Sequence, residues 1–172
     1  ILLTTEESAH RASVHPIHSF ANPQNSLEDF SGTACAIEGD PSATDILTAL
    51  FSAIGGKCFF LNADKKALYH AATVMACNNL ISLLSLSQQM LEAAYIDRNT
   101  TGQLLQPLIE NSLNNYFRSG DVDALTGPIS RGDGTTVAAH LDSLKDHPQW
   151  QKIYSSLGEI AVSLSAQQGF AS

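Results

Sequence analysis

A stretch of 25 residues without a charged side chain, residues 67–91, constrains this sequence more than any other feature. It is long enough to cross a bilayer as a helix. Its imidazole and amide side chains are costly in lipid: they are His70, Asn78, Asn79, Gln88 and Gln89. A helix that is apolar nearly all round is also typical of the centre of a bundle or of a dimer interface. We therefore expect a buried central helix and no membrane span.

The part of the chain before this stretch, residues 1–62, alternates between strand and helix patterns. A strand is expected at residues 12–14, ending in a turn at His15-Pro16, because the residue before a proline favours extended backbone. The apolar run at residues 33–38 is closed by a Gly-Asp-Pro turn, which predicts a buried strand.

A helix and another strand follow. Ser42 is expected to cap a helix that stops at Gly55-Gly56, and residues 57–61 read as a strand. The helix has apolar residues at helical spacing, namely Ile46, Leu47, Leu50, Phe51 and Ile54. Strand, helix and strand joined by short loops predict a parallel or mixed α/β sheet.

After Asn62 the strand patterns disappear. Asp64 is expected to cap a long helix that runs to about Ile96. The remaining elements are expected in this order: a helix from Asn99 or Thr100, a loop at 120–134, and helices at about 135–146 and 149–168. The sequence thus predicts an α/β part, residues 1–62, and an all-helical part, residues 63–172.

Charge and cysteine content exclude several classes of protein. Seventeen acidic residues against nine basic ones give a formal net charge of −8, and the only adjacent basic pair is Lys65-Lys66. Such a surface repels phosphate backbones, so we expect no nucleic-acid binding. Cys35, Cys58 and Cys77 are an odd number in apolar surroundings, which predicts free, buried thiols in a reducing compartment.

Three clusters of residues contain side chains that could bind a ligand or take part in catalysis. The first begins at His15-Pro16 and includes His18 and Ser19, after a predicted strand. In open α/β sheets, ligands bind beyond the carboxyl ends of strands. The two histidines are also three residues apart, with Glu28 or Asp29 as further metal ligands, but the proline disfavours a regular helix and no metal signature is present. We expect no metal.

The second cluster lies at the start of the long helix. Lys66, Tyr69 or His70, and Thr73 are three or four residues apart and share a face, and Asn78 follows two to three turns later. Lysine, histidine and tyrosine donate and accept protons at carbonyl or hydroxyl carbons. The alternative is that Tyr69 and His70 form hydrogen bonds within a helical bundle.

The third cluster is the glycine-rich segment 126–136. It surrounds Arg131 with three glycines and a proline and leads into a helix N-terminus, where backbone N–H groups favour an anion. Arg131 has the geometry to clamp a carboxylate or phosphate. A structural turn, with Asp133 or a threonine as the helix cap, fits these residues equally well. The sequence has no GxGxxG, P-loop or GxSxG motif, so it cannot bind a dinucleotide in the usual way by itself.

Four segments together resemble one known family. They read SVHPIHSFA (13–21), GTACAIEGD (32–40), LFSAIGGKCFFLNADKKALYHAATVMACNNL (50–80) and LTGPISRGDGTTVAAHL (125–141). In order and spacing they resemble the C-terminal part of the Rossmann-like proteins that carry the domain of unknown function numbered 2520. More distantly, the chain is similar to the helical C-terminal domains of 6-phosphogluconate dehydrogenase-like enzymes, including pyrroline-carboxylate and ketopantoate reductases.

The resemblance implies a fold: the last strands of a Rossmann-like sheet, followed by a helical domain like the C-terminal domain of 6-phosphogluconate dehydrogenase. Members of this family begin with a nucleotide-binding domain. We therefore expect the chain to be the C-terminal portion of a longer protein, with NAD(P) bound mainly by a segment absent from it. The resemblance also implies a cytoplasmic homodimer that acts on a small molecule.

By the same resemblance, His15 and Pro16 contact the nicotinamide of the cofactor. The residues expected to bind substrate are His15, Ser19, Asn78, Thr126, Gly127, Arg131 and Asp133. The expected catalytic residues are His70, Lys66 and Tyr69, with His70 or Lys66 as the proton donor.

One departure affects the chemistry. Hydroxyacid dehydrogenases place an asparagine four residues after the lysine of this helix, whereas here Lys66 is followed by His70 at that offset. The function expected is an NAD(P)-dependent oxidoreductase of a small carbonyl, imine or hydroxy acid, with Arg131 binding an anionic group. The alternative is a non-catalytic nucleotide- or metabolite-binding or dimerisation module.

Overall fold

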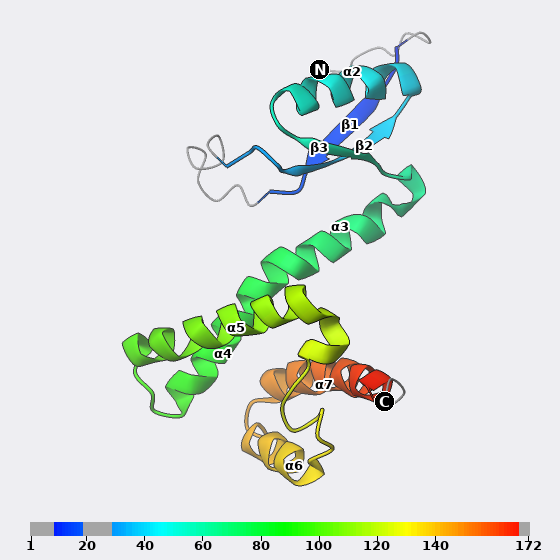
Figure 1. Cartoon of the computed structure of the whole chain (residues 1–172). Helices are drawn as coiled ribbons and strands as arrows, with labels where there is room; N and C mark the ends of the chain where they lie inside the picture. Colours follow the sequence, from blue (N-terminus) through cyan, green and yellow to red (C-terminus); the bar gives the residue numbers. More distant parts are fainter. Residues whose placement is uncertain (1–8, 19–28, 169–172) are drawn as a thin grey trace. The chain divides into compact units, whose positions relative to one another are not determined.

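The structure is a computed structural model that describes residues 9–18 and 29–168. The chain forms two compact units, residues 1–83 and residues 84–172. Strands occur only in the first unit among the described residues, and helices make up most of the second. The predicted order, an α/β part followed by helices, is confirmed (Figure 1).

The first unit contains a three-stranded mixed sheet in the order β1-β2-β3. Strand β1 (Ala12–Pro16) pairs antiparallel with β2 (Ala34–Gly39), and β2 pairs parallel with β3 (Lys57–Phe60). The predicted strands are confirmed, except that β1 continues through His15 and Pro16, where a turn was expected. Pro16 cannot donate a backbone hydrogen bond, and a strand at the edge of the sheet tolerates this because only one of its sides is paired.

Helix α2 (Pro41–Ala53) connects β2 to β3. It begins one residue before the predicted cap Ser42, because Pro41 fits the first helical turn. Asp40 occupies the cap position, but its carboxylate accepts a hydrogen bond from the backbone N–H of Arg11 at 2.7 Å instead. Gly55 has a φ of +88° and begins the turn into β3, as the Gly-Gly pair predicts.

The core of the first unit lies between the sheet and α2. Cys35 and Ile37 of β2 are 0% and 1% exposed, and Thr44 of α2 is also buried. Side chains alternate along a strand, so Cys35, Ile37 and Cys58 share one face. The Cys58 thiol contacts the carbonyl oxygen of Thr48 at 3.9 Å, which identifies this face as the one that α2 covers.

The long helical segment follows β3 as four consecutive pieces. They are η1 (Ala63–Lys65), α3 (Lys66–Val74), the π-helical turn η2 (Met75–Asn79) and α4 (Leu80–Ala93). The cap is Asn62 and not the predicted Asp64, since the Asn62 side chain accepts a hydrogen bond from the N–H of Asp64.

The expectation that this helix is buried is wrong within the chain. No residue of α3, η2 or α4 is buried, and Leu68, Met75 and Ile81 are 70%, 56% and 64% exposed. The segment Ala63–Ala93 contains an 18-residue window with a mean hydropathy of 1.2, which just meets the length and composition of a membrane span. Core helices of soluble proteins also pass this test. Cys77 lies in this segment and is exposed, so the prediction of three buried thiols holds for Cys35 alone.

The second unit contains α5 (Arg98–Ala124), α6 (Gly134–Ser143) and α7 (Pro148–Gln168) besides most of α4. The cap of α5 is Asp97, whose carboxylate accepts hydrogen bonds from the N–H groups of Asn99 and Thr100. At Gly120 the backbone leaves the helical conformation, with a φ of +81°, and kinks α5. The loop predicted at 120–134 is shorter in the structure, because α5 continues to Ala124.

Candidate active site

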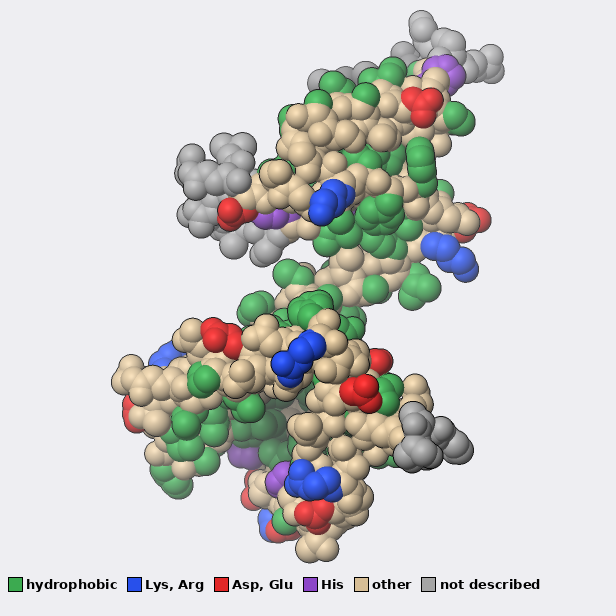
Figure 2. All heavy atoms as spheres, in the orientation of Figure 1, with side chains coloured by type: hydrophobic (Ala, Val, Ile, Leu, Met, Phe, Trp, Pro, Cys, Tyr) green, Lys and Arg blue, Asp and Glu red, His purple; other side chains and the backbone are tan. Residues whose placement is uncertain are grey.

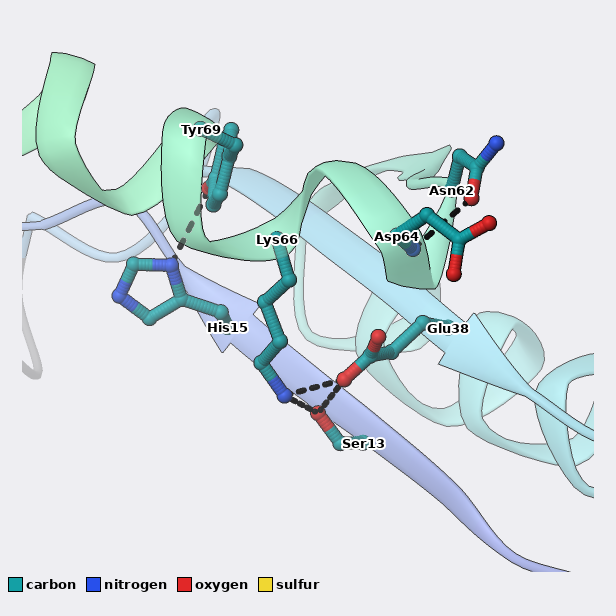
Figure 3. Close-up of polar contacts among 7 residues, drawn as sticks. All are labelled: Ser13, His15, Glu38, Asn62, Asp64, Lys66 and Tyr69. Carbon is teal, nitrogen blue, oxygen red and sulfur yellow. Dashed lines mark hydrogen bonds and ion pairs between the residues drawn. The ribbon is translucent and has the colours of Figure 1, made fainter.

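One face of the sheet carries polar side chains, and the first turns of α3 lie over it (Figure 3). Ser13 and His15 are two residues apart on β1 and therefore point to the same side. In the pairing register, Ser13 lies opposite Glu38 and His15 lies opposite Ala36. This polar face is opposite the face that α2 covers.

His15 and Tyr69 are joined by a hydrogen bond between β1 and α3. The Nδ1 atom of His15 lies 3.1 Å from the hydroxyl oxygen of Tyr69 (Figure 3). Which atom donates depends on the tautomer of the imidazole ring. The ring of His70 also meets His15 edge-on, with centroids 5.6 Å apart, and the ring of Phe59 contacts Tyr69 at 6.2 Å. The structure thus brings together three of the predicted site residues, His15, Tyr69 and His70.

The surroundings of Tyr69 keep its hydroxyl group neutral. Burial raises the pKa of the Tyr69 phenol above its ordinary value. At high pH, repulsion between the phenolate and the Cys35 thiolate acts in the same direction. A neutral phenol can donate a proton or a hydrogen bond at neutral pH, whereas a phenolate could only accept one. His70 is exposed, whereas Tyr69 is half-buried.

Lys66 is held by two partners on the sheet. Its ammonium group forms an ion pair with Glu38 and donates a hydrogen bond to the Ser13 hydroxyl oxygen at 3.3 Å (Figure 3). The Ser13 hydroxyl in turn donates to Glu38 at 3.3 Å. The hydrogen bond from Lys66 lowers the pKa of Glu38, and the attraction of the ammonium charge and the hydrogen bond from Ser13 act in the same direction. The lysine is therefore committed to a polar network beside the pair His15–Tyr69.

Because β1 runs antiparallel to β2, His15 does not lie at the edge of the sheet where the sequence pattern predicts ligand binding. The carboxyl end of β1, at Pro16, lies opposite Cys35 near the start of β2, and therefore at the amino ends of the parallel strands. The rule for ligands beyond the carboxyl ends of parallel strands does not apply there. His15 belongs to the cluster because it faces α3. Pro16 is the last residue of β1, and Ser19 and Glu28 lie outside the described residues.

Asn78 is not part of this cluster. It lies in the π-helical turn η2, where its side chain is exposed and its backbone carbonyl accepts a hydrogen bond from the hydroxyl of Ser82. A π-helical turn inserts one residue into the helical repeat, so spacing along an ideal helix does not predict which face Asn78 occupies.

The remaining predicted residues belong to the second unit, in the connection between α5 and α6. Thr126 and Arg131 are exposed, and Gly127 has a φ of +96°. Asp133 caps α6: its carboxylate accepts hydrogen bonds from the Thr136 N–H at 3.0 Å and the Thr136 hydroxyl at 2.6 Å. Both bonds lower the pKa of Asp133, and the bond from the Thr136 hydroxyl has the larger effect. The positive charge of Arg131 lowers the pKa further. The capping role that the sequence allowed for Asp133 is confirmed.

The side chain of Gln168, at the end of α7, holds the same connection. Its amide nitrogen donates hydrogen bonds to the backbone carbonyls of Val122 and Leu125, and its amide oxygen accepts one from the Ser130 hydroxyl. Gln168 thus holds the end of α5 and the connection that follows it, although it lies 38 or more positions further along the chain.

Sequence reasoning missed Ser13, Glu38 and Phe59. The signal for Ser13 was present, because it precedes His15 by two residues in a strand and so shares its face. Glu38 and Phe59 join the face only through the pairing of β1, β2 and β3. That register is not encoded in any local pattern of the sequence.

Comparison with known proteins assigns the family. Residues 33–160 match the family described as Domain of unknown function (DUF2520), and the chain belongs to this family. Among curated proteins, none matches the chain.

Solved structures share the fold. Protein TM1727 from Thermotoga maritima superposes with a TM-score of 0.78 and 26% sequence identity, covering 92% of this chain and 62% of that one. The putative NADP oxidoreductase BF3122 from Bacteroides fragilis has a TM-score of 0.75 and 21% identity, covering 91% of this chain and 59% of that one. The present chain therefore spans about three fifths of the length of either protein.

The charged cap of α6 should make stability depend on pH. The pKa of Asp133 is lowered by folding, so its contribution is complete above the pKa of the unfolded chain, about 4, and is lost as the pH falls through the folded-state pKa. We expect Asp133→Ala to lower the thermal midpoint at neutral pH, and the difference from the unmodified protein to shrink below about pH 4. Circular dichroism at several pH values measures this, with the exposed Asp123→Ala as control. A difference that stays constant with pH would contradict the expectation.

Proposed function

We propose that this chain is the C-terminal portion of an NAD(P)-dependent oxidoreductase that acts on a small carbonyl, imine or hydroxy acid. The observation that carries the proposal is the cluster of His15, Tyr69 and His70, three proton-handling side chains from a strand and a helix. The likeness of fold to the protein named as a putative NADP oxidoreductase supports it. On this proposal, the helical part corresponds to the C-terminal domain of 6-phosphogluconate dehydrogenase-like enzymes, and the enzyme works in the cytoplasm.

The residues of the first unit are suited to contact the nicotinamide of such a cofactor and not its phosphate groups. A dinucleotide fold binds phosphate at its first strand-to-helix turn, whereas the strands of this unit correspond to the last ones of the sheet. The strand-to-helix turn of this unit runs from β2 to α2. Here it carries the Asp40 carboxylate, and a Cβ atom on Gly39 would lie 2.2 Å from the carbonyl oxygen of Arg11, so the glycine serves strand packing. We therefore propose that phosphate contacts come mainly from a segment absent from this chain, with His15 and Pro16 against the nicotinamide.

The bound cofactor would supply a hydride to, or accept one from, the substrate carbon. The role of this chain is then to donate the accompanying proton when the substrate is reduced and to accept it when the substrate is oxidised. His70, exposed and edge-on to His15, is proposed as the donor, and the neutral Tyr69 hydroxyl orients the His15 ring through its hydrogen bond. Lys66 is the less suitable donor, because its ammonium protons are engaged by Glu38 and Ser13.

Substrate-binding residues are proposed in the second unit as well. The exposed guanidinium of Arg131, between Gly127 and the start of α6, offers paired donors for a carboxylate or phosphate group. Thr126 and Gly127 would contribute a hydroxyl and backbone groups. Asp133 is proposed to act there through the fixed start of α6, since its carboxylate is already bonded to Thr136.

Loss of the proton donor should slow turnover. In the full-length enzyme, His70→Ala is expected to reduce kcat by about 10²–10⁴-fold, the usual contribution of general acid catalysis. The assay follows oxidation of NADPH with a panel of small carbonyl and imine compounds, and the exposed His10→Ala is the matched control. Unchanged turnover in His70→Ala would remove His70 from the mechanism, and unchanged turnover in His15→Ala and Tyr69→Phe as well would remove the cluster.

A second candidate function, dimerisation, is favoured by the uncovered helical segment. Hydrophobic side chains reach the molecular surface in many places (Figure 2). On the helical segment they include Leu68, Met75 and Ile81, each more than half exposed. We propose that a second copy of the chain covers this segment, since a helix so apolar is stable in water only when another surface excludes the solvent.

Sedimentation velocity tests this proposal. We expect a dimer whose dissociation constant rises at least about tenfold in Leu68→Gln and in Ile81→Gln, because truncated anchors at the centre of an interface cost more than about 1.4 kcal/mol. The control is Ile46→Gln on α2, which is 62% exposed and lies outside the segment. A protein that stays monomeric at high concentration, or a dimer insensitive to both substitutions, would contradict the proposal.

A further inference from the structure

The network of Lys66, Glu38 and Ser13 joins the same two elements as the hydrogen bond between His15 and Tyr69. Lys66 is the first residue of α3, and Tyr69 follows it by three positions, so both side chains lie on one side of the helix. On the sheet, Ser13 precedes His15 by two positions on the same face of β1. Two polar connections therefore tie the first turn of α3 to one short stretch of β1 and β2 (Figure 3).

These connections matter because little else holds α3 against the sheet. No residue of α3 is buried. The apolar contact that involves Tyr69 is the edge of the Phe59 ring, at a centroid distance of 6.2 Å. Without a buried apolar face, the direction of a helix depends on the polar contacts at its ends and on the few rings that touch it.

We propose that Glu38, together with Ser13, is a positioning residue: it holds the ammonium group of Lys66 so that the first turn of α3 places the Tyr69 hydroxyl on Nδ1 of His15. The importance of this arrangement for catalysis rests on the function proposed above. The arrangement itself does not, since it is a property of the chain without cofactor or substrate.

Glu38 is suited to this task by its place in the sheet. It is paired with Ser13 in the register, so its carboxylate and the Ser13 hydroxyl meet Lys66 from adjacent strands. Its side chain is only 15% exposed whereas that of Lys66 is 50% exposed, so the more fixed partner is on the sheet. A fixed carboxylate restricts the long lysine side chain and, through it, the helix that carries Tyr69.

The test is a spectrum of the His15 imidazole ring in the 172-residue protein, without cofactor. Long-range ¹H–¹⁵N correlations report whether Nδ1 of a histidine has a hydrogen-bond partner. His15→Gln identifies the signal among the six histidines of the chain. Tyr69→Phe removes the partner hydroxyl and so defines the signal of an unbonded Nδ1. All spectra are taken at one pH, because the face also carries the titratable groups of His70, Lys66, Glu38 and, by strand alternation, Lys57.

We expect Glu38→Gln and Lys66→Met each to shift the Nδ1 signal to its position in Tyr69→Phe, with no further change in the double variant, because both substitutions break one connection. Lys66→Arg keeps the charge and the reach to Glu38 and should retain the original signal. Ser13→Ala should shift it part of the way. The control is Asp64→Asn, which removes an exposed carboxylate from η1, next to α3, and should change nothing.

The proposal is overturned if Glu38→Gln and Lys66→Met fold, as circular dichroism shows, and both keep the original Nδ1 signal. It is overturned equally if Asp64→Asn shifts the signal as much as Glu38→Gln does, because loss of any nearby negative charge would then explain the shift. If Glu38→Gln does not fold, Lys66→Met against Lys66→Arg decides alone. Failure of the proposed oxidoreductase function would appear in turnover and would leave these spectra unchanged.

Discussion

The central strand β2 is the constraint on which the first unit depends. Its alternation sends Cys35 and Ile37 into the core under α2 and Ala36 and Glu38 to the opposite face. Ala36 is paired with His15 on one side and with Phe59 on the other. A residue as small as alanine between two rings leaves room for Tyr69, which contacts both. A larger residue at position 36 would occupy the space that this side chain uses.

The same alternation gives the two faces of the sheet different roles, one in stability and the other in the proposed site. The face toward α2 buries Cys35 and Ile37, and this burial stabilises the unit, while Phe60 on the same face is 70% exposed. The face toward α3 carries a carboxylate, a hydroxyl and an imidazole, which meet the phenol and the ammonium group of α3, and no residue of that helix is buried. Substitutions on the α3 face can therefore alter the proposed site while the core under α2 remains intact.

The sequence predicted the order of elements well because its signals are local. Gly55, Gly120 and the apolar run of β2 act within a few residues of themselves, and the structure confirms the turns and the strand that they predict. The antiparallel direction of β1 depends on pairing between distant segments, and so does the contact of Glu38 with Lys66. Pairing of this kind has no local signature, and it decided which predicted residues came together.

The uncharged stretch was misjudged for a related reason. Its composition predicts that something covers the helix, and both the centre of a bundle and a dimer interface fit that composition. In the structure no residue of this segment is buried within the chain, and its cover by a second copy stays a proposal. His70 shows the opposite case: its spacing from Lys66 identified the face, and the structure places its ring beside His15.

Titration of NADPH and NADH into the full-length protein, followed by cofactor fluorescence, tests whether the protein binds a nicotinamide cofactor, with this 172-residue chain as the reference. We expect tight binding by the full-length protein, little by the chain alone, and a change in the environment of the nicotinamide when His15 is replaced by alanine. Absence of binding by the full-length protein for both cofactors would contradict the account, and His15, Tyr69 and His70 would then be structural contacts between β1 and α3.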